Sequence, residues 1–202
     1  LYACNAASAP GVSPSPVRPI APPCTARKWR ASGTMSSARC RNAGIGKGAP
    51  LGSGKLWANR ATIETNLVAA LVQIETALEM FQKSGSGHLV LVASVAGNRG
   101  VPGVKAAYAA SKAGLISLGQ SLRAEYYRGP IRVTVLEPGY IESEMTAGSA
   151  STMLMVDNET GVRAMVGAIE RERGRAVVPA WPWTAVVALM KLTPTRFAKL
   201  FS

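Results

Sequence analysis

Hydrophobic residues recur at regular intervals in this chain from about residue 55 onward. In the segment 57–82, five apolar residues follow one another at steps of three or four positions: Leu67, Leu71, Ile74, Leu78 and Phe81. Because an α-helix has about 3.6 residues per turn, this spacing predicts a long helix with one apolar face. The same spacing predicts a second helix over 106–127 and a third over 159–174.

Short apolar runs alternate with these predicted helices. The run 88–94, HLVLVAS, and the run 131–139, IRVTVLEPG, are typical of strands buried on both faces of a sheet. Helices and strands in alternation predict right-handed crossovers in a parallel sheet, and therefore an α/β fold. Residues 175–180 predict an edge strand. The apolar tail 181–202 predicts a helix packed on the domain or on a partner subunit, with a membrane surface as the alternative.

The first 41 residues differ from the rest of the chain. They contain neither an apolar run nor a helical repeat, and they consist mainly of Ala, Pro, Ser, Arg and Cys. The stretch 36–41, SSARCR, is predicted not to be a buried parallel strand, because its arginines would enter an apolar interior without a partner. We therefore expect an irregular, disordered or non-native segment over 1–41, an α/β domain over 42–180 and an apolar extension over 181–202.

Positive charge is concentrated at the same end of the chain. The formal net charge is +12, and residues 1–63 contain nine Lys or Arg and no Asp or Glu. One alternative is therefore a basic module that binds nucleic acid or a membrane surface, with the α/β part as a non-catalytic scaffold. The remaining residues are close to balanced, so we expect no nucleic-acid partner for the α/β domain itself.

The three cysteines indicate neither a disulfide framework nor a metal site. Their number is odd, their spacing is irregular, and the one histidine, His88, is predicted to be structural. The chain starts without the basic and apolar parts of a secretory signal, and no run reaches the about 20 residues that span a bilayer. We expect a cytoplasmic protein, with peripheral membrane contact of the tail as the alternative.

Two glycine-rich stretches have the spacing of phosphate-binding loops but not the context. GIGKGA at 44–49 follows no apolar run, and Pro50 stands where a helix should begin. In APLGSGKL at 49–56, Leu56 replaces the hydroxyl residue that would bind magnesium. Neither stretch is therefore predicted to bind phosphate.

A tyrosine and a lysine in the second predicted helix have a spacing that suits acid–base chemistry. Tyr108 and Lys112 are four residues apart, so both side chains lie on one face of the helix. A phenol has a pKa of about 10, and a nearby ammonium favours the phenolate, which makes it a usable proton donor and acceptor. Ser94 ends an apolar run, where open α/β sheets bind ligands, and its hydroxyl is suited to hold a carbonyl oxygen.

These residues stand among five motifs that resemble the classical branch of the short-chain dehydrogenase/reductase family over about residues 42–180. The motifs are NAG at 42–44, Asn66, Ser94 in VASVAG, YAASK at 108–112 and PGYIESEMT at 138–146. The resemblance implies a partial Rossmann-type, doubly wound parallel sheet. It also implies a hydride transfer between NAD or NADP and a carbonyl or alcohol carbon of a small-molecule substrate. A homo-oligomer in which the two long helices pair between subunits is implied as well.

The resemblance implies a role for each matching residue. Tyr108 exchanges a proton with the substrate oxygen, Ser94 polarises that oxygen, and Lys112 binds the nicotinamide ribose while it assists Tyr108. Asn66 holds a water molecule that links Lys112 to solvent. The other matches flank or cover the cofactor: Asn42, Ala43, Gly44, Pro138, Gly139, Ile141 and Ser143. Ser143 stands where the family more often has Thr, and it retains the hydroxyl.

The family pattern is incomplete before Asn42. The glycine-rich turn and the strand that selects NAD or NADP have no counterpart, and residues 1–41 fill a space that typically needs about twice as many residues. Two alternatives remain: a divergent protein with a basic arm, or an out-of-frame or misassembled segment joined to the carboxyl-terminal half. The composition favours the second, for which we expect the first βαβ units to be absent and cofactor binding and activity to be impaired.

Overall fold

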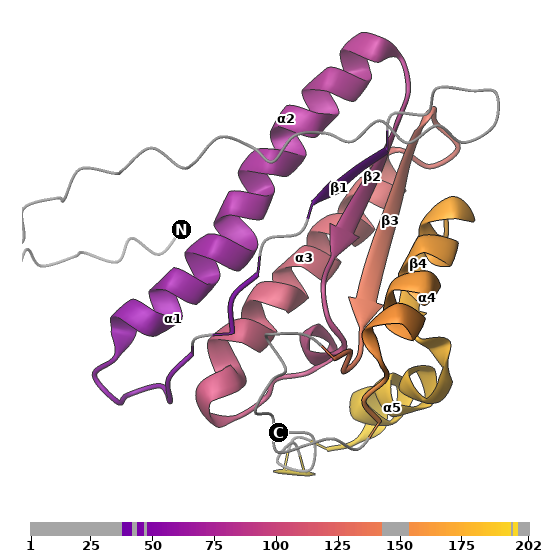
Figure 1. Cartoon of the computed structure of the whole chain (residues 1–202). Helices are drawn as coiled ribbons and strands as arrows, with labels where there is room; N and C mark the ends of the chain where they lie inside the picture. The colour runs from indigo at the N-terminus through magenta and orange to yellow at the C-terminus, as the bar shows by residue number, and fades with distance from the viewer. Residues whose placement is uncertain (1–37, 42–43, 47, 143–153, 195, 198–202) are drawn as a thin grey trace, which may run out of the picture.

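The structure, a computed structural model, describes residues 38–41, 44–46, 48–142, 154–194 and 196–197. Its centre is a four-stranded parallel sheet in the order β1–β2–β3–β4. The strands are, in the same order, Ala38–Arg41, Gly87–Val92, Ile131–Pro138 and Arg175–Val178. Helices lie in each connection between neighbouring strands (Figure 1). The parallel α/β fold predicted from the alternation of apolar runs is therefore confirmed.

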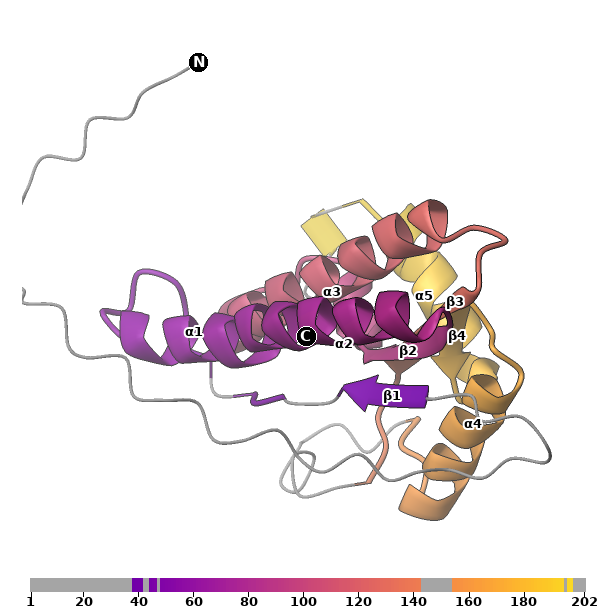
Figure 2. The ribbon, with the colours of Figure 1, turned by 90° about the horizontal axis from the view of Figure 1, so that it is seen from above.

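Helices cover both faces of this sheet, with α2 and α3 on one side and α4 on the other (Figure 2). The connection from β1 to β2 consists of α1 (Leu56–Ile63), the π-helical turn η1 (Glu64–Val68) and α2 (Ala69–Ser84). Two 3-10 turns, η2 (Val95–Asn98) and η3 (Gly103–Lys105), lead from β2 into α3 (Ala106–Glu125). The remaining helices are α4 (Asn158–Glu170), before β4, and α5 (Ala180–Leu192), after it.

The core is divided by the sheet because neighbouring residues of a strand point to opposite faces. On the side of α2 and α3, Leu89 and Leu91 of β2 contact apolar residues of α2 that include Ile74 and Phe81. On the side of α4, Val90 of β2 lies in a second cluster that includes Ala168. These two clusters hold the strands in parallel, so that the residues following β2 and β3 emerge at the same end of the sheet.

The stretch before Asn42 forms a strand, contrary to the expectation for SSARCR. Ala38–Arg41 pairs in parallel with residues 88–91 of β2. The expectation assumed a strand enclosed on both sides, whereas β1 is the edge strand of the described sheet and pairs with one neighbour through its backbone. Charged residues are common on edge strands because they prevent further strand pairing. The expectations for residues 1–37 concern residues outside the described part of the chain.

The two long predicted helices are present, but the first is interrupted. The segment 57–82 consists of α1, η1 and α2, and the predicted face is buried at Ile74, Leu78 and Phe81. Leu71, on the same predicted apolar face, is 41% exposed.

The apolar tail begins with α5, which packs on the domain. Its buried side chains include Trp183 and Val187, which contact Val95 of η2. No helix in the part of the chain that the structure describes is long and apolar enough to cross a membrane. These contacts with Val95 place α5 against the turn that follows β2.

Candidate active site

Ser94 lies two residues after β2 and begins the turn η2. Its hydroxyl accepts a hydrogen bond from the backbone N–H of Ala96 at 3.2 Å, and its carbonyl oxygen accepts one from Gly97 at 3.0 Å. A Cβ on Gly97 would lie 2.7 Å from the backbone carbon of Lys112, so the turn can approach α3 this closely only with glycine at that position. The turn therefore holds the Ser94 hydroxyl next to the helix that carries Tyr108 and Lys112.

Lys112 is buried next to the ring of Tyr108. Its side chain is 3% exposed, and its ammonium donates to the carbonyl oxygen of Val92 at 3.0 Å and lies 5.8 Å from the centre of the Tyr108 ring. Burial lowers the pKa of Lys112 from 10.5 to about 8, because the charged form loses its hydration. An ammonium has three N–H donors, and the described residues account for one of them. The other two suit a ligand that carries hydroxyl groups.

The phenol of Tyr108 is more difficult to ionise than the spacing argument predicts. Burial raises the pKa of Tyr108 above its ordinary value of 10.0, a hydrogen bond with the Ser94 side chain lowers it in part, and Tyr140 raises it further. The expected shift toward the phenolate is therefore wrong for this structure, because the loss of hydration is the largest effect. The effect of Ser94 on the pKa of Tyr108 indicates that the two side chains predicted to act on a substrate oxygen are neighbours. At neutral pH the phenol is a proton donor.

Asn66 is fully buried in the π-helical turn η1, at 0% exposure. Its side-chain amide accepts a hydrogen bond from the Ile45 backbone N–H at 2.8 Å and donates to the Ile45 carbonyl at 3.0 Å. It also donates to the Ser111 hydroxyl at 3.2 Å, and Ser111 donates to the Tyr108 carbonyl at 2.7 Å. Asn66 thus connects the segment after Gly44 to α3. The expected link through water stays a prediction.

The residues predicted to flank the cofactor lie at the same end of the sheet where they are described. Gly44 precedes Ile45, which Asn66 holds. Pro138 ends β3, and the Gly139 N–H donates to the Val178 carbonyl at 2.9 Å. Ile141 forms an isolated bridge with Val156. Three predicted residues lie outside the described part of the chain: Asn42, Ala43 and Ser143.

Two further residues lie near the phenol that sequence reasoning did not identify. Tyr140 raises the pKa of Tyr108, its hydroxyl accepts a hydrogen bond from the Lys105 ammonium at 3.3 Å, and its ring packs edge-on against Trp183 at 5.4 Å. Lys105 precedes Tyr108 by about one helical turn, and this spacing could have identified it. Tyr140 directly follows Pro138 and Gly139, and this position next to two predicted site residues could have identified it.

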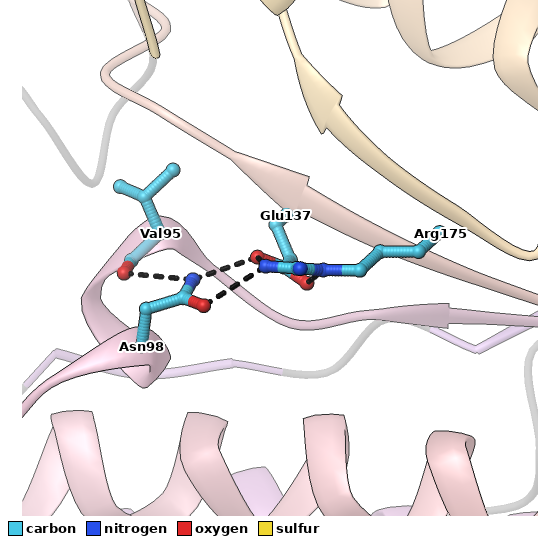
Figure 3. A network of polar contacts seen from close by, with 4 residues as sticks. All are labelled: Val95, Asn98, Glu137 and Arg175. Carbon is cyan, nitrogen blue, oxygen red and sulfur yellow. Dashed lines mark hydrogen bonds and ion pairs between the residues drawn. The ribbon is translucent and has the colours of Figure 1, made fainter. Parts of the chain in front are cut away.

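A buried ionic network lies at the same end of the sheet (Figure 3). The Glu137 side chain is 0% exposed and accepts hydrogen bonds from Arg175 Nε at 2.5 Å and Nη2 at 2.7 Å. Asn98 Nδ2 donates to Glu137 at 2.7 Å and to the Val95 carbonyl at 3.2 Å, and Asn98 Oδ1 accepts from Arg175 Nη2 at 2.9 Å. Each of the three side chains thus contacts the other two. A Glu near the end of a mostly apolar strand is the feature of the sequence that could have indicated this network.

His88 lies at the other end of β2 from Ser94 and hydrogen-bonds to Thr134 at 2.8 Å. Burial lowers the pKa of His88, so the ring is neutral at neutral pH. These contacts agree with the predicted structural role. The described residues contain no group of His, Cys, Asp and Glu side chains that could hold a metal ion.

Comparison with known proteins relates the sequence to a family of enzymes. The family profile described as short chain dehydrogenase matches residues 40–154, more than half of the chain. Uncharacterized oxidoreductases from two strains of Mycobacterium tuberculosis are 76% identical over 161 residues, which is 80% of this chain and 64% of each relative. An uncharacterized oxidoreductase from Myxococcus xanthus is 37% identical and covers 70% of this chain and 52% of that relative. The chain therefore spans less than two thirds of the length of these relatives.

Solved structures with the same fold include two that contain a nicotinamide cofactor. A short chain dehydrogenase from Burkholderia cenocepacia in complex with NADP has a TM-score of 0.62 at 26% identity, covering 78% of this chain and 69% of that chain. A 4-hydroxyisoleucine dehydrogenase complexed with NADH and succinate has a TM-score of 0.62 at 28% identity, covering 73% of this chain and 68% of that chain. Both resemble the described α/β fold over most of its length.

Proposed function

This chain belongs to the short chain dehydrogenase family, and we propose that it is an oxidoreductase that transfers a hydride between NAD or NADP and a small-molecule carbonyl or alcohol. The observation that carries this proposal is the buried ammonium of Lys112, which lies 5.8 Å from the centre of the Tyr108 ring, with the Ser94 side chain near enough to lower the pKa of Tyr108. The cofactor-containing structures with the same fold support NAD or NADP as the hydride carrier.

In the reductive direction, Tyr108 supplies the proton. Its raised pKa keeps the phenol protonated at neutral pH, so the hydroxyl can donate to a carbonyl oxygen as that oxygen gains negative charge. The Ser94 hydroxyl, which already lies within hydrogen-bonding reach of Tyr108, holds the same oxygen. In the oxidative direction the Tyr108 phenol first releases its own proton to solvent, and the phenolate then accepts the proton of the alcohol. The nicotinamide, when bound, would supply the carbon that accepts the hydride.

The residues that would hold the cofactor fit its chemistry. The Lys112 ammonium uses one N–H donor for the Val92 carbonyl, and its other two donors suit the hydroxyls of the nicotinamide ribose. Gly44, Pro138, Gly139 and Ile141 are the proposed backbone and apolar surface around the cofactor, and Asn42, Ala43 and Ser143 complete the proposed set. For Asn66 we retain the proposed water link, supported by its burial and by its contact with Ser111 beside Lys112.

The proposal includes a homo-oligomer in which the two long helical segments, α1–α2 and α3, pair between subunits. Several large apolar residues of the α1–α2 segment are exposed: Leu56, Trp57, Val68, Leu71, Val72 and Met80. An exposed apolar face of this kind is typical of a subunit contact. The comparisons support neither the alternative of a basic binding module nor the expected impairment of activity, since the similar proteins are oxidoreductases.

Replacement of Tyr108 by Phe tests the proposed chemistry. The Tyr108→Phe protein should oxidise NADH or NADPH with a panel of aldehydes and ketones at least about 100-fold more slowly, because Phe keeps the ring and removes the transferable proton. Tyr127→Phe is the matched control, because Tyr127 is 73% exposed. Turnover by Tyr108→Phe at the unmodified rate would show that another group transfers the proton.

A further inference from the structure

The network of Glu137, Asn98 and Arg175 joins three segments that surround the candidate active site. Asn98 ends the turn η2, and Ser94 caps the start of that turn. Glu137 directly precedes Pro138 and Gly139, and Arg175 begins β4. Asn98 lies 39 positions before Glu137, and Glu137 lies 38 positions before Arg175, so the three residues come from distant parts of the sequence. The network therefore fixes the end of β3 relative to the turn that carries Ser94.

We propose that Glu137 and Arg175, acting through Asn98, are positioning residues that hold the Ser94 hydroxyl in place for proton transfer. The Asn98 side chain is held on one side by Glu137 and Arg175, and on the other it donates to the Val95 carbonyl within η2. The same turn contains the hydrogen bonds from Ala96 and Gly97 to Ser94. A shift of Asn98 is thus transmitted to Ser94 through a single turn of backbone.

Stability alone does not explain a charged group at this position. An ion pair with a fully buried carboxylate contributes little or nothing compared with apolar residues of similar volume, because Glu137 loses its hydration completely and Arg175, at 32% exposure, loses part of its own. The planar guanidinium of Arg175 instead binds both Glu137 oxygens and Asn98 in a fixed orientation. Geometry of this kind defines where a turn lies, which matters for catalysis since misplacement by about 1 Å can reduce a rate by about 100-fold.

This inference depends on the proposed function only for the role of Ser94, and the first measurement does not require turnover. Hydrogen exchange of the Ala96 and Gly97 amides reports directly on the turn, because both donate to Ser94. In the full-length protein, Asn98→Ala should increase their exchange at least about tenfold while the amides of β2 stay protected. Glu172→Gln is the control, because it breaks the exposed Arg132–Glu172 pair.

The second measurement is a double-mutant cycle in turnover. With the Ser94 hydroxyl present, Asn98→Ala should lower kcat about tenfold or more and change the Kd of NADPH or NADH less than about twofold. In the Ser94→Ala background, the same change should lower kcat less than about twofold, because the group that Asn98 positions is already absent. Arg175→Lys, which keeps the charge but not the planar fork, should behave like Asn98→Ala and replaces it if that variant does not fold.

The outcomes separate the inference from the proposed function. Equal losses of kcat in both backgrounds would show that the network acts elsewhere, and unchanged kcat with unchanged exchange would show that it positions nothing. If the unmodified protein reduces no carbonyl compound, the proposed function fails. In that case amide exchange still decides whether the network holds the turn.

Discussion

Replacement of Lys112 by Met should change the pH dependence of stability in a defined way. Lys112 is 3% exposed, and its pKa falls from 10.5 to about 8 on folding. Below about pH 8 the folded protein must carry a buried ammonium, which destabilises it relative to the unfolded chain. Between pH 8 and 10.5 the folded state binds fewer protons than the unfolded state, so stability rises with pH. Met has a similar length and no charge, and it removes this dependence.

The expected magnitude follows from the two pKa values of Lys112. Each pKa unit corresponds to about 1.4 kcal/mol, so a fall from 10.5 to about 8 gives about 3.5 kcal/mol when complete. By about pH 10 the unfolded chain is still mostly protonated, and about 2.5 kcal/mol of the difference has developed. Loss of the hydrogen bond to Val92 costs Lys112→Met about 1 kcal/mol at every pH. This loss is the same at every pH, so it does not change how the free energy of unfolding varies with pH.

Urea unfolding from about pH 7 to about pH 10 measures this effect. The free energy of unfolding of the unmodified protein, minus that of Lys112→Met, should increase by about 2.5 kcal/mol over this range. The subtraction removes the contributions of other groups that titrate. Lys83→Met, at an exposed position of α2, is the matched control. A flat difference for Lys112→Met would refute the claim that the ammonium is buried without adequate compensation.

Two further predictions concern the ionic network and the subunit contact. Arg175→Met should lower the free energy of unfolding by about 3 kcal/mol in thermal or urea unfolding, because it leaves the Glu137 carboxylate buried without its partner. Arg163→Met, in the exposed pair with Glu159, should cost less than about 1 kcal/mol, and an equal loss for both would contradict the assignment. Light scattering of the folded protein should give a multiple of the monomer mass, which Leu71→Glu should reduce because Leu71 lies on the exposed apolar face. A monomeric mass before mutation would contradict the proposed contact.

The fold and the central residues of the site could be predicted because each depends on short-range pattern. The apolar runs that became β2 and β3 are read from neighbouring residues, and the common face of Tyr108 and Lys112 follows from helical geometry. The position of Ser94 follows from the rule that ligands bind at the carboxyl ends of parallel strands. None of these predictions requires knowing which distant segments of the chain lie in contact.

Other features depend on contacts between distant residues and could not be predicted in this way. Asn66 and Ile45 are 21 positions apart, and Asn98 and Arg175 are 77 apart. The side chains of residues 38–41 do not predict the strand β1 for a related reason. This strand pairs with β2 through backbone hydrogen bonds, which do not depend on the type of side chain. The direction of the Tyr108 pKa shift was missed because helical spacing indicates a nearby charge but not the loss of hydration around the phenol.

The opposing shifts of Tyr108 and Lys112 indicate how the site prepares for proton transfer. Burial disfavours both the phenolate and the ammonium: Tyr108 stays a neutral phenol, whereas Lys112, with a pKa of about 8, still carries its charge at neutral pH. In the proposed reaction, the phenolate that forms when Tyr108 donates its proton would face the Lys112 ammonium, which lies 5.8 Å from the centre of the ring, and the attraction between these opposite charges is stronger where water is excluded. The cost of burying Lys112 is therefore present before the reaction and is offset as charge develops on Tyr108. An arrangement that destabilises the resting protein in this way stabilises the transition state more than the ground state.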